Sequence, residues 1–314
     1  DRKASINPEK CISCGECTVQ CPFGAIMDKS CIVEAIQLLM GADTWGYHVY
    51  AALAPSFAGQ FEGTVGQLVT ALRQMGFYDV MEVALGADLT AQTEAAEFEE
   101  RGGNMLSSCC PAFVEFVEKN LPAQAELLSK TPSPMVMTGR YIKERDPHAK
   151  VVFIGPCVAK KMEYQLGKTQ GAIDCVVTFE ELYAMMAGKG IELTELEETP
   201  LDEASGYGRA FAASGGVAAA VAQALRERNS KIEAHGLACA GVEECRAAIL
   251  KMSRGLLPEN FIEGMACALG GCVQGPAAIV RAPKNKAELT KHVKQAGERT
   301  IAQSVRQAEE TKGA

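Results

Sequence analysis

The cysteines of this 314-residue chain occur in tight groups, and this grouping limits the fold and the chemistry more than any other feature. There are 13 cysteines but only 4 histidines. Disulfide staples suit small secreted proteins, whereas this chain is long and 47% hydrophobic and can form a sizeable core without them. Grouped thiols in a chain without a visible signal peptide instead indicate metal binding.

Residues 11–21 hold the first group, in the pattern C-x2-C-x2-C-x3-C followed by proline. Bacterial ferredoxins bind a [4Fe–4S] cluster with this pattern. Zinc is the main alternative, but zinc sites usually combine two separated cysteine pairs. We therefore expect Cys11, Cys14 and Cys17 to bind iron, with Cys21 as a further ligand.

The fourth ligand of this cluster stays open, because in two-cluster ferredoxins the last cysteine of each run binds the other cluster. The sequence contains no second run. Either an upstream segment holds it, which we expect because the chain begins at Asp1, or Cys21 or Cys31 completes a single cluster. Cys31 opens an apolar segment, which favours a buried thiol rather than a ligand.

After residue 47 strand-like and helix-like segments alternate, which predicts an α/β fold with parallel sheets flanked by helices. Apolar runs that predict strands lie at residues 48–54, 80–85, 105–108, 150–154, 172–178 and 233–239. Helices are predicted to start near residues 32, 64, 88, 111, 179, 217, 242 and 286. We expect Asp88 to be an N-cap, residues 286–310 to form one closing helix, and 188–208 and 253–262 to be loops.

Cys110 and Cys157 each follow a predicted strand, with Cys267 as a further candidate for the same position. Ligands in parallel α/β folds bind beyond the carboxyl ends of the strands. These three cysteines belong to three segments, SSCCPAF at 107–113, GPCVAKKME at 155–163 and EGMACALGGCVQGP at 263–276.

In this order the three segments resemble the motifs TSCCPxW, MPCxxKxxE and ExMACxGGCxxG of the [FeFe]-hydrogenases. The resemblance runs from the ferredoxin-type run to about residue 280. It implies a partial ferredoxin-like domain over 1–34, a two-lobed catalytic domain over 35–284 with its cluster in the cleft between the lobes, and a C-terminal amphipathic helix over 285–314.

The resemblance also implies the family's cofactor, the H-cluster. This is a [4Fe–4S] cube joined through one thiolate to a two-iron unit with CO, cyanide and a bridging dithiolate amine. Carried over by motif position, the cube ligands are Cys110, Cys157, Cys267 and Cys272, and Cys272 is the bridge.

Two polar side chains would serve the two-iron unit. Lys160 is expected to contact cyanide, although a solvent-facing lysine is the usual alternative. Cys109 is expected to face the amine and pass protons, because a thiol has a pKa nearer neutrality than a hydroxyl. Its alternative is an inert core thiol.

The family's proton path aligns with Cys109, Glu97, Ser129 and Glu94, expected in that order from the pocket to solvent. A carboxyl whose pKa is raised by burial can exchange protons near neutral pH. Read alone, Glu97 and Arg101 are an ordinary i,i+4 surface pair. The residues expected to line the pocket are Ala54, Pro55, Ser56, Pro156, Phe211 and Met265.

Several positions depart from the family pattern and indicate a divergent branch. The last motif has C-x4-C in place of C-x3-C, which changes how the bridging thiolate approaches. Gly155 replaces the usual Met, which would open space near the bridging CO, and Phe113 replaces Trp.

The expected activity is the reversible conversion of two protons and two electrons to H2. It implies a ferredoxin-like redox partner or electron-transfer subunit, maturation proteins for the two-iron unit, and a cytoplasmic location. The net charge of −8 disfavours nucleic acid, and no apolar stretch is long enough for membrane insertion. The alternatives are a non-catalytic Fe–S assembly relative without the two-iron unit and an H2 sensor.

Overall fold

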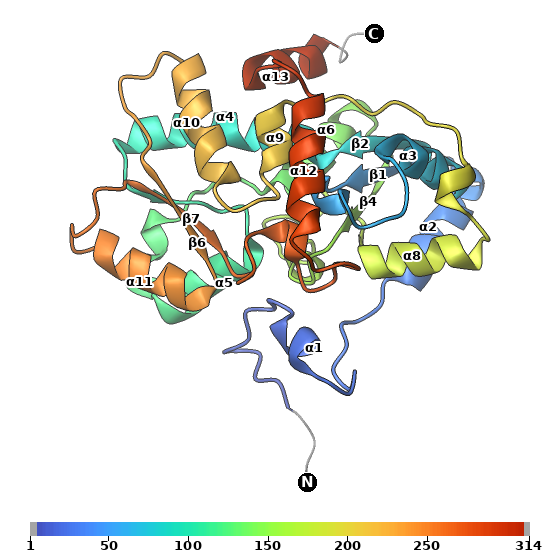
Figure 1. The fold of residues 1–314 in the computed structure, drawn as a ribbon, viewed down its shortest axis with the longest axis horizontal. Coiled ribbons are helices and arrows are strands. Elements are labelled where there is room, and N and C mark those ends of the chain that lie inside the picture. The colour runs from blue at the N-terminus through green and yellow to red at the C-terminus, as the bar shows by residue number, and fades with distance from the viewer. Residues whose placement is uncertain (1–4, 311–314) are drawn as a thin grey trace.

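The computed structural model describes residues 5–310, which form two parallel sheets flanked by helices (Figure 1). The four-stranded sheet has the order β2-β1-β4-β5, and the three-stranded sheet has the order β3-β7-β6. The strands are β1 (Val49–Leu53), β2 (Asp79–Glu82), β3 (Met105–Leu106), β4 (Lys150–Gly155), β5 (Cys175–Thr178), β6 (Gly236–Ala240) and β7 (Phe261–Met265). Every pairing is parallel, which confirms the predicted fold class.

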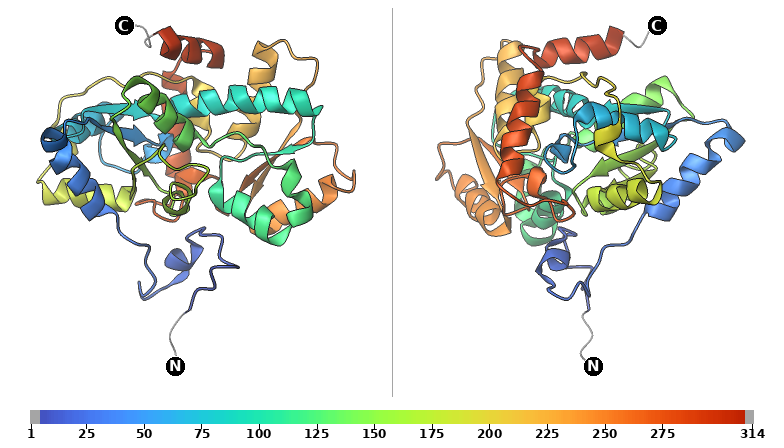
Figure 2. Two further views of the ribbon diagram at one scale, coloured as in Figure 1. Left: turned by 180° about the vertical axis from the view of Figure 1, so that it is seen from behind. Right: turned by 45° about the vertical axis from the view of Figure 1, so that its right-hand side comes forward.

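The helices cover the faces of these sheets and connect the strands. Their bounds are α1 (Glu16–Gln20), α2 (Ile32–Trp45), α3 (Val65–Gln74), α4 (Val83–Arg101), α5 (Pro111–Asn120), α6 (Pro134–Arg145), α7 (Lys160–Glu163), α8 (Phe179–Gly188), α9 (Gly206–Ala210), α10 (Gly216–Glu227), α11 (Val242–Met252), α12 (Lys284–Gln295) and α13 (Ile301–Glu310). Helix α4 packs against α6 beside the first sheet and α10 beside the second, so it joins the two lobes (Figure 2).

Local sequence signals set several of these boundaries. Thr64 and Gln67 form a reciprocal capping box at the start of α3, as their spacing suggests, and Thr178 and Glu181 form another at α8. Such boxes satisfy backbone N–H groups that the first turn of a helix leaves unpaired.

The predicted strand at residues 80–85 is wrong in its second half, and Asp88 is not an N-cap. Strand β2 ends at Glu82 and α4 begins at Val83, so Asp88 lies inside the helix. There it is fully buried and accepts hydrogen bonds from Ser205, at 2.8 Å from the backbone nitrogen and 2.6 Å from the hydroxyl. Over a few residues, the sequence of a buried helix cannot be distinguished from that of a buried strand, because both are continuous apolar runs.

The C-terminal segment also differs from its prediction. Residues 286–310 do not form one helix, because α12 ends at Gln295 and α13 begins at Ile301. Gly297 between them has φ +61°, a left-handed conformation that interrupts a helix. The two expected loops also contain short elements: α9 begins within 188–208 and β7 begins at the end of 253–262.

Helix α6 was not predicted, although Ser133 and Pro134 provide a helix start.

No helix within residues 5–310 combines the length and hydrophobicity that spanning a bilayer requires. The segment around α1 projects from one side of the two sheets, and a short connection leads from it to α2 (Figure 1).

Candidate metal centre

Four cysteines from three distant segments lie at the carboxyl ends of parallel strands. Cys110 follows β3 as the N-cap of α5, Cys157 comes two residues after β4, and Cys267 comes two residues after β7. Cys272 begins the next short turn of 3-10 helix. Because β3 pairs with β7, their ends are adjacent, and the site opens toward the end of β4.

Three of the four cysteines line one narrow, mainly apolar pocket with a volume of about 70 Å³. The predicted site residues that line it are Ala54, Pro55, Ser56, Cys109, Cys110, Pro156, Cys157, Lys160, Phe211, Met265 and Cys272. The fourth cysteine, Cys267, is not among the lining residues, but its thiol is electrostatically coupled to those of Cys272, Cys157 and Cys110. The three cysteine segments therefore meet at this pocket.

The thiols of this cluster suit a cationic metal group. Burial, and then the charge of neighbouring thiols, raises the pKa of Cys157 to about 11 and raises the pKa of Cys267 and Cys272 above the ordinary value. Four thiolates in a buried site repel one another unless positive charge compensates them. Iron supplies that charge, and thiolates are its usual ligands in clusters. The donor set therefore fits a cysteine-bound iron–sulfur cluster.

Lys160 is buried in this pocket and does not face solvent. Its ammonium donates hydrogen bonds to Glu163 Oε2 at 2.6 Å and to the Cys109 carbonyl at 3.3 Å. Burial alone would lower the pKa of Lys160, but the Glu163 carboxylate overrides it and the pKa is raised. A lysine ammonium has three donors, so one remains for an anionic ligand in the pocket.

Glu94 on α4 lies behind Cys109 and is fully buried. Its Oε1 accepts hydrogen bonds from the Ser108 backbone nitrogen at 3.2 Å and from the Ser108 hydroxyl at 3.4 Å. Its Oε2 has no hydrogen-bond partner within residues 5–310. Burial raises the pKa of Glu94 to about 7, which places its proton exchange near neutrality. Burial also raises the pKa of the Cys109 thiol well above its ordinary value, so this thiol stays protonated.

Glu97 lies one helical turn further along α4, toward the surface. Its Oε2 accepts hydrogen bonds from the Ser129 hydroxyl at 2.6 Å and from Thr131 at 3.0 Å, and Arg101 pairs with Oε1. Burial would raise the pKa of Glu97, but these donors outweigh it and the pKa is lowered. Glu97 and Arg101 are thus more than a surface pair. The expected order of the carboxyls is wrong, because Glu94 is the inner one, next to Cys109, and Glu97 the outer one.

The space expected beside Gly155 is filled, so that prediction is wrong. The ring of Phe153 lies 2.7 Å from the position that a Cβ of residue 155 would take. Phe153 and Gly155 point to the same face of β4, since alternate strand residues do so, and Phe153 lines the pocket. The ring of Phe153 thus fills the volume that the methionine of the family motif would occupy at position 155.

The longer C-x4-C segment is accommodated by a turn with two left-handed glycines. Gly270 has φ +95° and Gly271 has φ +107°. A Cβ on Gly271 would lie 2.6 Å from the Ala212 carbonyl oxygen, so only glycine fits this close approach. Leu269, in the same turn, is exposed, and the segment therefore bulges toward solvent.

Sequence reasoning missed six pocket residues, which are Val83, Ala87, Pro134, Met135, Phe153 and Ala212. Most are small or apolar side chains without a chemical signature. Pro134 and Met135 begin the unpredicted helix α6, and the Ser-Pro helix start was the available signal.

The ferredoxin-type run lies next to the cysteine cluster. Ile12 and Cys14 pack against the buried apolar group that includes Cys110 and Ala159, and Cys157 and Ala266 pack against the same group. Burial raises the pKa of Cys14, and the charges of Cys17 and Cys11 add to this, so both thiols lie within electrostatic range of Cys14. Cys21 has a different environment: backbone N–H groups of the following turn lower its pKa, and Ala25 donates to its sulfur at 3.3 Å.

Two contacts hold this run against the rest of the molecule. Lys119 on α5 donates hydrogen bonds to the carbonyl oxygens of Pro8 at 3.1 Å and Cys11 at 2.6 Å. Gly15 has φ +80°, and a Cβ there would lie 2.7 Å from the Pro276 ring and 3.0 Å from Val158. The backbone of the run thus approaches the loop that carries Cys157 very closely.

We expect Gly15→Val to detach the run from this surface, because the new side chain would collide with Pro276 and Val158. A loss of about 1–2 kcal/mol in this contact raises the open population roughly 5–30-fold. Limited proteolysis in the 22–30 connection should speed up accordingly. Gly24→Val is the control, since Gly24 has φ +58° but nothing within 4 Å of its Cβ position. Equal cleavage of the two variants would contradict this role of Gly15.

Buried thiols at the carboxyl ends of parallel strands, with a ferredoxin-type run beside them, define an α/β iron–sulfur protein. Residues 47–276 match the family model described as iron only hydrogenase large subunit, C-terminal domain, and residues 4–27 match the 4Fe-4S binding domain. The chain belongs to the iron-only hydrogenase large-subunit family.

Both hydrogenases and Fe–S cluster assembly factors are similar to this chain. Iron hydrogenase 1 from Clostridium pasteurianum is 30% identical, over 81% of this chain and 53% of that protein. The cytosolic Fe-S cluster assembly factor narfl from Xenopus tropicalis is 23% identical, over 78% of this chain and 63% of that protein. The chain spans about half the length of the curated hydrogenases it matches.

The fold has counterparts among solved structures. A variant of the [FeFe]-hydrogenase HydA1 from Chlamydomonas reinhardtii superposes with a TM-score of 0.73 at 23% identity, covering 90% of this chain and 94% of that one. A structure described as a step in [FeFe]-hydrogenase H-cluster assembly gives a TM-score of 0.72 at 22% identity. This likeness shows the shared fold.

Proposed function

We propose that this protein is a hydrogenase that interconverts protons, electrons and H2 at an H-cluster. The observation that carries the proposal is the joint placement of three kinds of group around one pocket. Cysteines of the cube are on one side, Lys160 offers a free donor to an anionic ligand, and Cys109 leads to the buried carboxyl of Glu94.

The residues present would hold the H-cluster as follows. Cys110, Cys157, Cys267 and Cys272 would bind the cube, and Lys160, Ser56 and Met265 would surround the two-iron unit. The Ser56 hydroxyl is buried without a partner within residues 5–310, so it has a free donor for a ligand in this pocket. When bound, the H-cluster supplies the iron at which two protons and two electrons combine.

The side chains of α4 and the 129–131 loop then carry protons between pocket and surface. Cys109 holds a proton at the pocket wall, and Glu94 exchanges it at a pKa near 7. The Ser129 hydroxyl donates to Glu97 at 2.6 Å, and the proton would pass from Glu94 to this pair at the outer end of the path. Arg101 keeps Glu97 ionised at the outer end and ready to take up a proton.

Electrons would enter through a [4Fe–4S] cluster at Cys11, Cys14 and Cys17, which lie beside the Cys157 loop. The donor would be a ferredoxin-like protein or an electron-transfer subunit, and separate maturation proteins would build the two-iron unit in the cytoplasm. We assign residues 1–34 to the electron-entry domain, 35–284 to the catalytic domain and 285–314 to a C-terminal segment, whose described part holds α13 and most of α12.

The second candidate is an Fe–S assembly factor without the two-iron unit, as the similarity to the Xenopus factor indicates. The buried Glu94 favours the hydrogenase, since an uncompensated carboxyl in the interior is costly and suits a protein that moves protons. An assay of H2 evolution by the matured protein tests the proposal. Turnover supports it, and a protein with intact cubes and no turnover favours the assembly factor.

We expect Cys109→Ala to lower H2 turnover by at least about 100-fold, because it removes the proton carrier at the pocket wall. Infrared spectra of the variant should still contain the CO and cyanide bands, which separates loss of proton transfer from loss of the cofactor. Cys239→Ala, at a buried thiol in β6, is the control and should keep its turnover. Full activity in the Cys109 variant would remove this residue from the path.

A further inference from the structure

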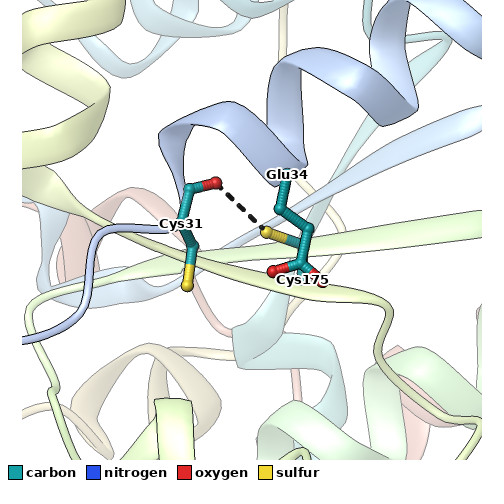
Figure 3. A group of neighbouring side chains, drawn as sticks. All are labelled: Cys31, Glu34 and Cys175. Carbon is teal, nitrogen blue, oxygen red and sulfur yellow. Dashed lines mark hydrogen bonds between the residues drawn. The ribbon is translucent and has the colours of Figure 1, made fainter.

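A second group of thiols lies outside the hydrogenase-like motifs, at the connection between the ferredoxin-type run and the catalytic domain. Cys31 is the N-cap of α2, Glu34 lies in the first turn of this helix, and Cys175 is the first residue of β5 (Figure 3). The connection and the central sheet therefore each contribute one sulfur.

The donor atoms of these residues converge. The two sulfurs and a carboxylate oxygen of Glu34 all lie within 4.8 Å of one another, and they form the one such group among residues 5–310. A tetrahedral zinc site with Zn–S bonds of about 2.3 Å places two sulfurs roughly 3.8 Å apart. Small side-chain rotations therefore suffice to bring the three donors onto one ion.

The surroundings favour a cation here. Lys161 is the nearby positive charge, and it is already paired with Asp28 at 2.6 Å and Glu181 at 2.9 Å. Glu181 also accepts a hydrogen bond from the backbone nitrogen of Cys31 at 2.7 Å. Once both thiols are ionised, the carboxylates and thiolates outnumber the single ammonium.

The three donor residues differ in how accessible they are to a metal ion from solvent. Cys175 is fully buried and Cys31 is 5% exposed, whereas Glu34 is exposed at the surface. A carboxylate at the mouth of two buried thiols can capture a hydrated ion and pass it inward. The Cys175 thiol donates to the Cys31 carbonyl oxygen at 3.7 Å, so the two residues are in direct contact.

We propose that Cys31, Glu34 and Cys175 form a structural site for a soft divalent cation of the zinc class. The ion binds both sulfurs as thiolates and one carboxylate oxygen, and the two thiol protons are released to solvent. A water molecule completes the four-coordinate shell. The bound ion ties the start of α2, and with it the connection to the ferredoxin-type run, to the edge strand β5.

The test uses protein with its iron–sulfur clusters in place, prepared without oxygen and titrated with Zn²⁺ after a chelator wash. Zinc and iron are counted by elemental analysis, and X-ray absorption at the zinc edge identifies the ligands. The unmodified protein should bind about one zinc more per chain than Cys31→Ala/Cys175→Ala, with two sulfurs and at least one oxygen around it. Glu34→Gln, at an exposed position, should weaken binding by about 10-fold or more.

The matched control is Cys239→Ala/Cys245→Ala, which also removes two buried thiols but leaves the proposed donors intact. It should bind as much zinc as the unmodified protein, and iron content should be equal in all variants. Equal zinc content in the Cys31→Ala/Cys175→Ala protein overturns the proposal. A Cys31–Cys175 disulfide in the protein prepared without oxygen, detected by mass spectrometry, also overturns it.

Discussion

Glu94→Gln is expected to lower H2 production by about 10²–10⁴-fold, the usual contribution of a positioned acid or base. The amide has nearly the same shape and can still accept the Ser108 hydrogen bonds, but it cannot exchange a proton. Glu94 is the inner carboxyl and is fully buried, so solvent cannot substitute for it. The measurement is H2 evolution at saturating reductant, with infrared spectra to verify equal cofactor content.

The pH dependence of H2 production tests the role of Glu94 in a second way. Burial raises the pKa of Glu94 to about 7, so the carboxyl holds its proton below that pH and loses it above. Turnover in the H2-producing direction should fall as the pH rises through about 7, and this break should be absent in the glutamine variant. The groups that face Glu94 are Ser108, Ser129, Cys109 and Glu97, and the charge of Glu97 raises its pKa further.

The control for this variant is Glu99→Gln, on the same helix but paired with Arg228 at the surface. It should keep the turnover and the pH break of the unmodified protein. If Glu94→Gln instead retained full turnover with its pH break, the proton path along α4 would be wrong.

Arg209→Met is expected to lower the free energy of unfolding by about 3–5 kcal/mol, because it leaves a buried carboxylate without its partner. Arg209 donates to both oxygens of Glu82, at 2.7 and 2.9 Å, and both side chains are only 2% exposed. This pair connects the β2–α4 junction to α9. Val83, which follows Glu82, and Phe211, two residues after Arg209, line the pocket. Urea unfolding of the variant gives the measurement.

Two further variants separate this cause from a general loss of packing. Arg73→Met removes an exposed ion pair between α3 and Asp79, which lies on β2 as Glu82 does. It should lower the free energy of unfolding by less than about 1 kcal/mol. Glu82→Met/Arg209→Met removes both charges and should recover much of the lost free energy. A loss of under about 1 kcal/mol in Arg209→Met would contradict the buried ion pair as a main support of this junction.

Much of the fold could be predicted from local signals. The capping box at Thr64 and Gln67 and the apolar runs of β1, β4 and β5 follow from short-range physics. The error at Asp88 arose because burial inside α4 depends on Ser205, which is distant in the sequence. The break between α12 and α13 depends on one glycine conformation that the periodic apolar pattern conceals.

The candidate site could be predicted where residues have chemical signatures. Cysteines, Lys160 and the carboxyls of α4 stand out by type and spacing. The structure brings Lys160 and four of the cysteines, Cys109, Cys110, Cys157 and Cys272, to one pocket. The predicted order of Glu97 and Glu94 was the reverse of the one found, because depth depends on which side of α4 the 129–131 loop covers. Phe153 could have been predicted as a pocket residue, because it lies on the same face of β4 as Gly155.

Infrared spectroscopy of the protein produced together with maturation proteins tests the central claim most directly. That claim is that the pocket beside Cys272 and Lys160 holds a two-iron unit in addition to a cube. We predict bands of metal-bound CO and cyanide in the unmodified protein and their loss in Cys272→Ala. Intact iron–sulfur cubes without any such bands, after full maturation, would contradict the account and leave an assembly-type protein.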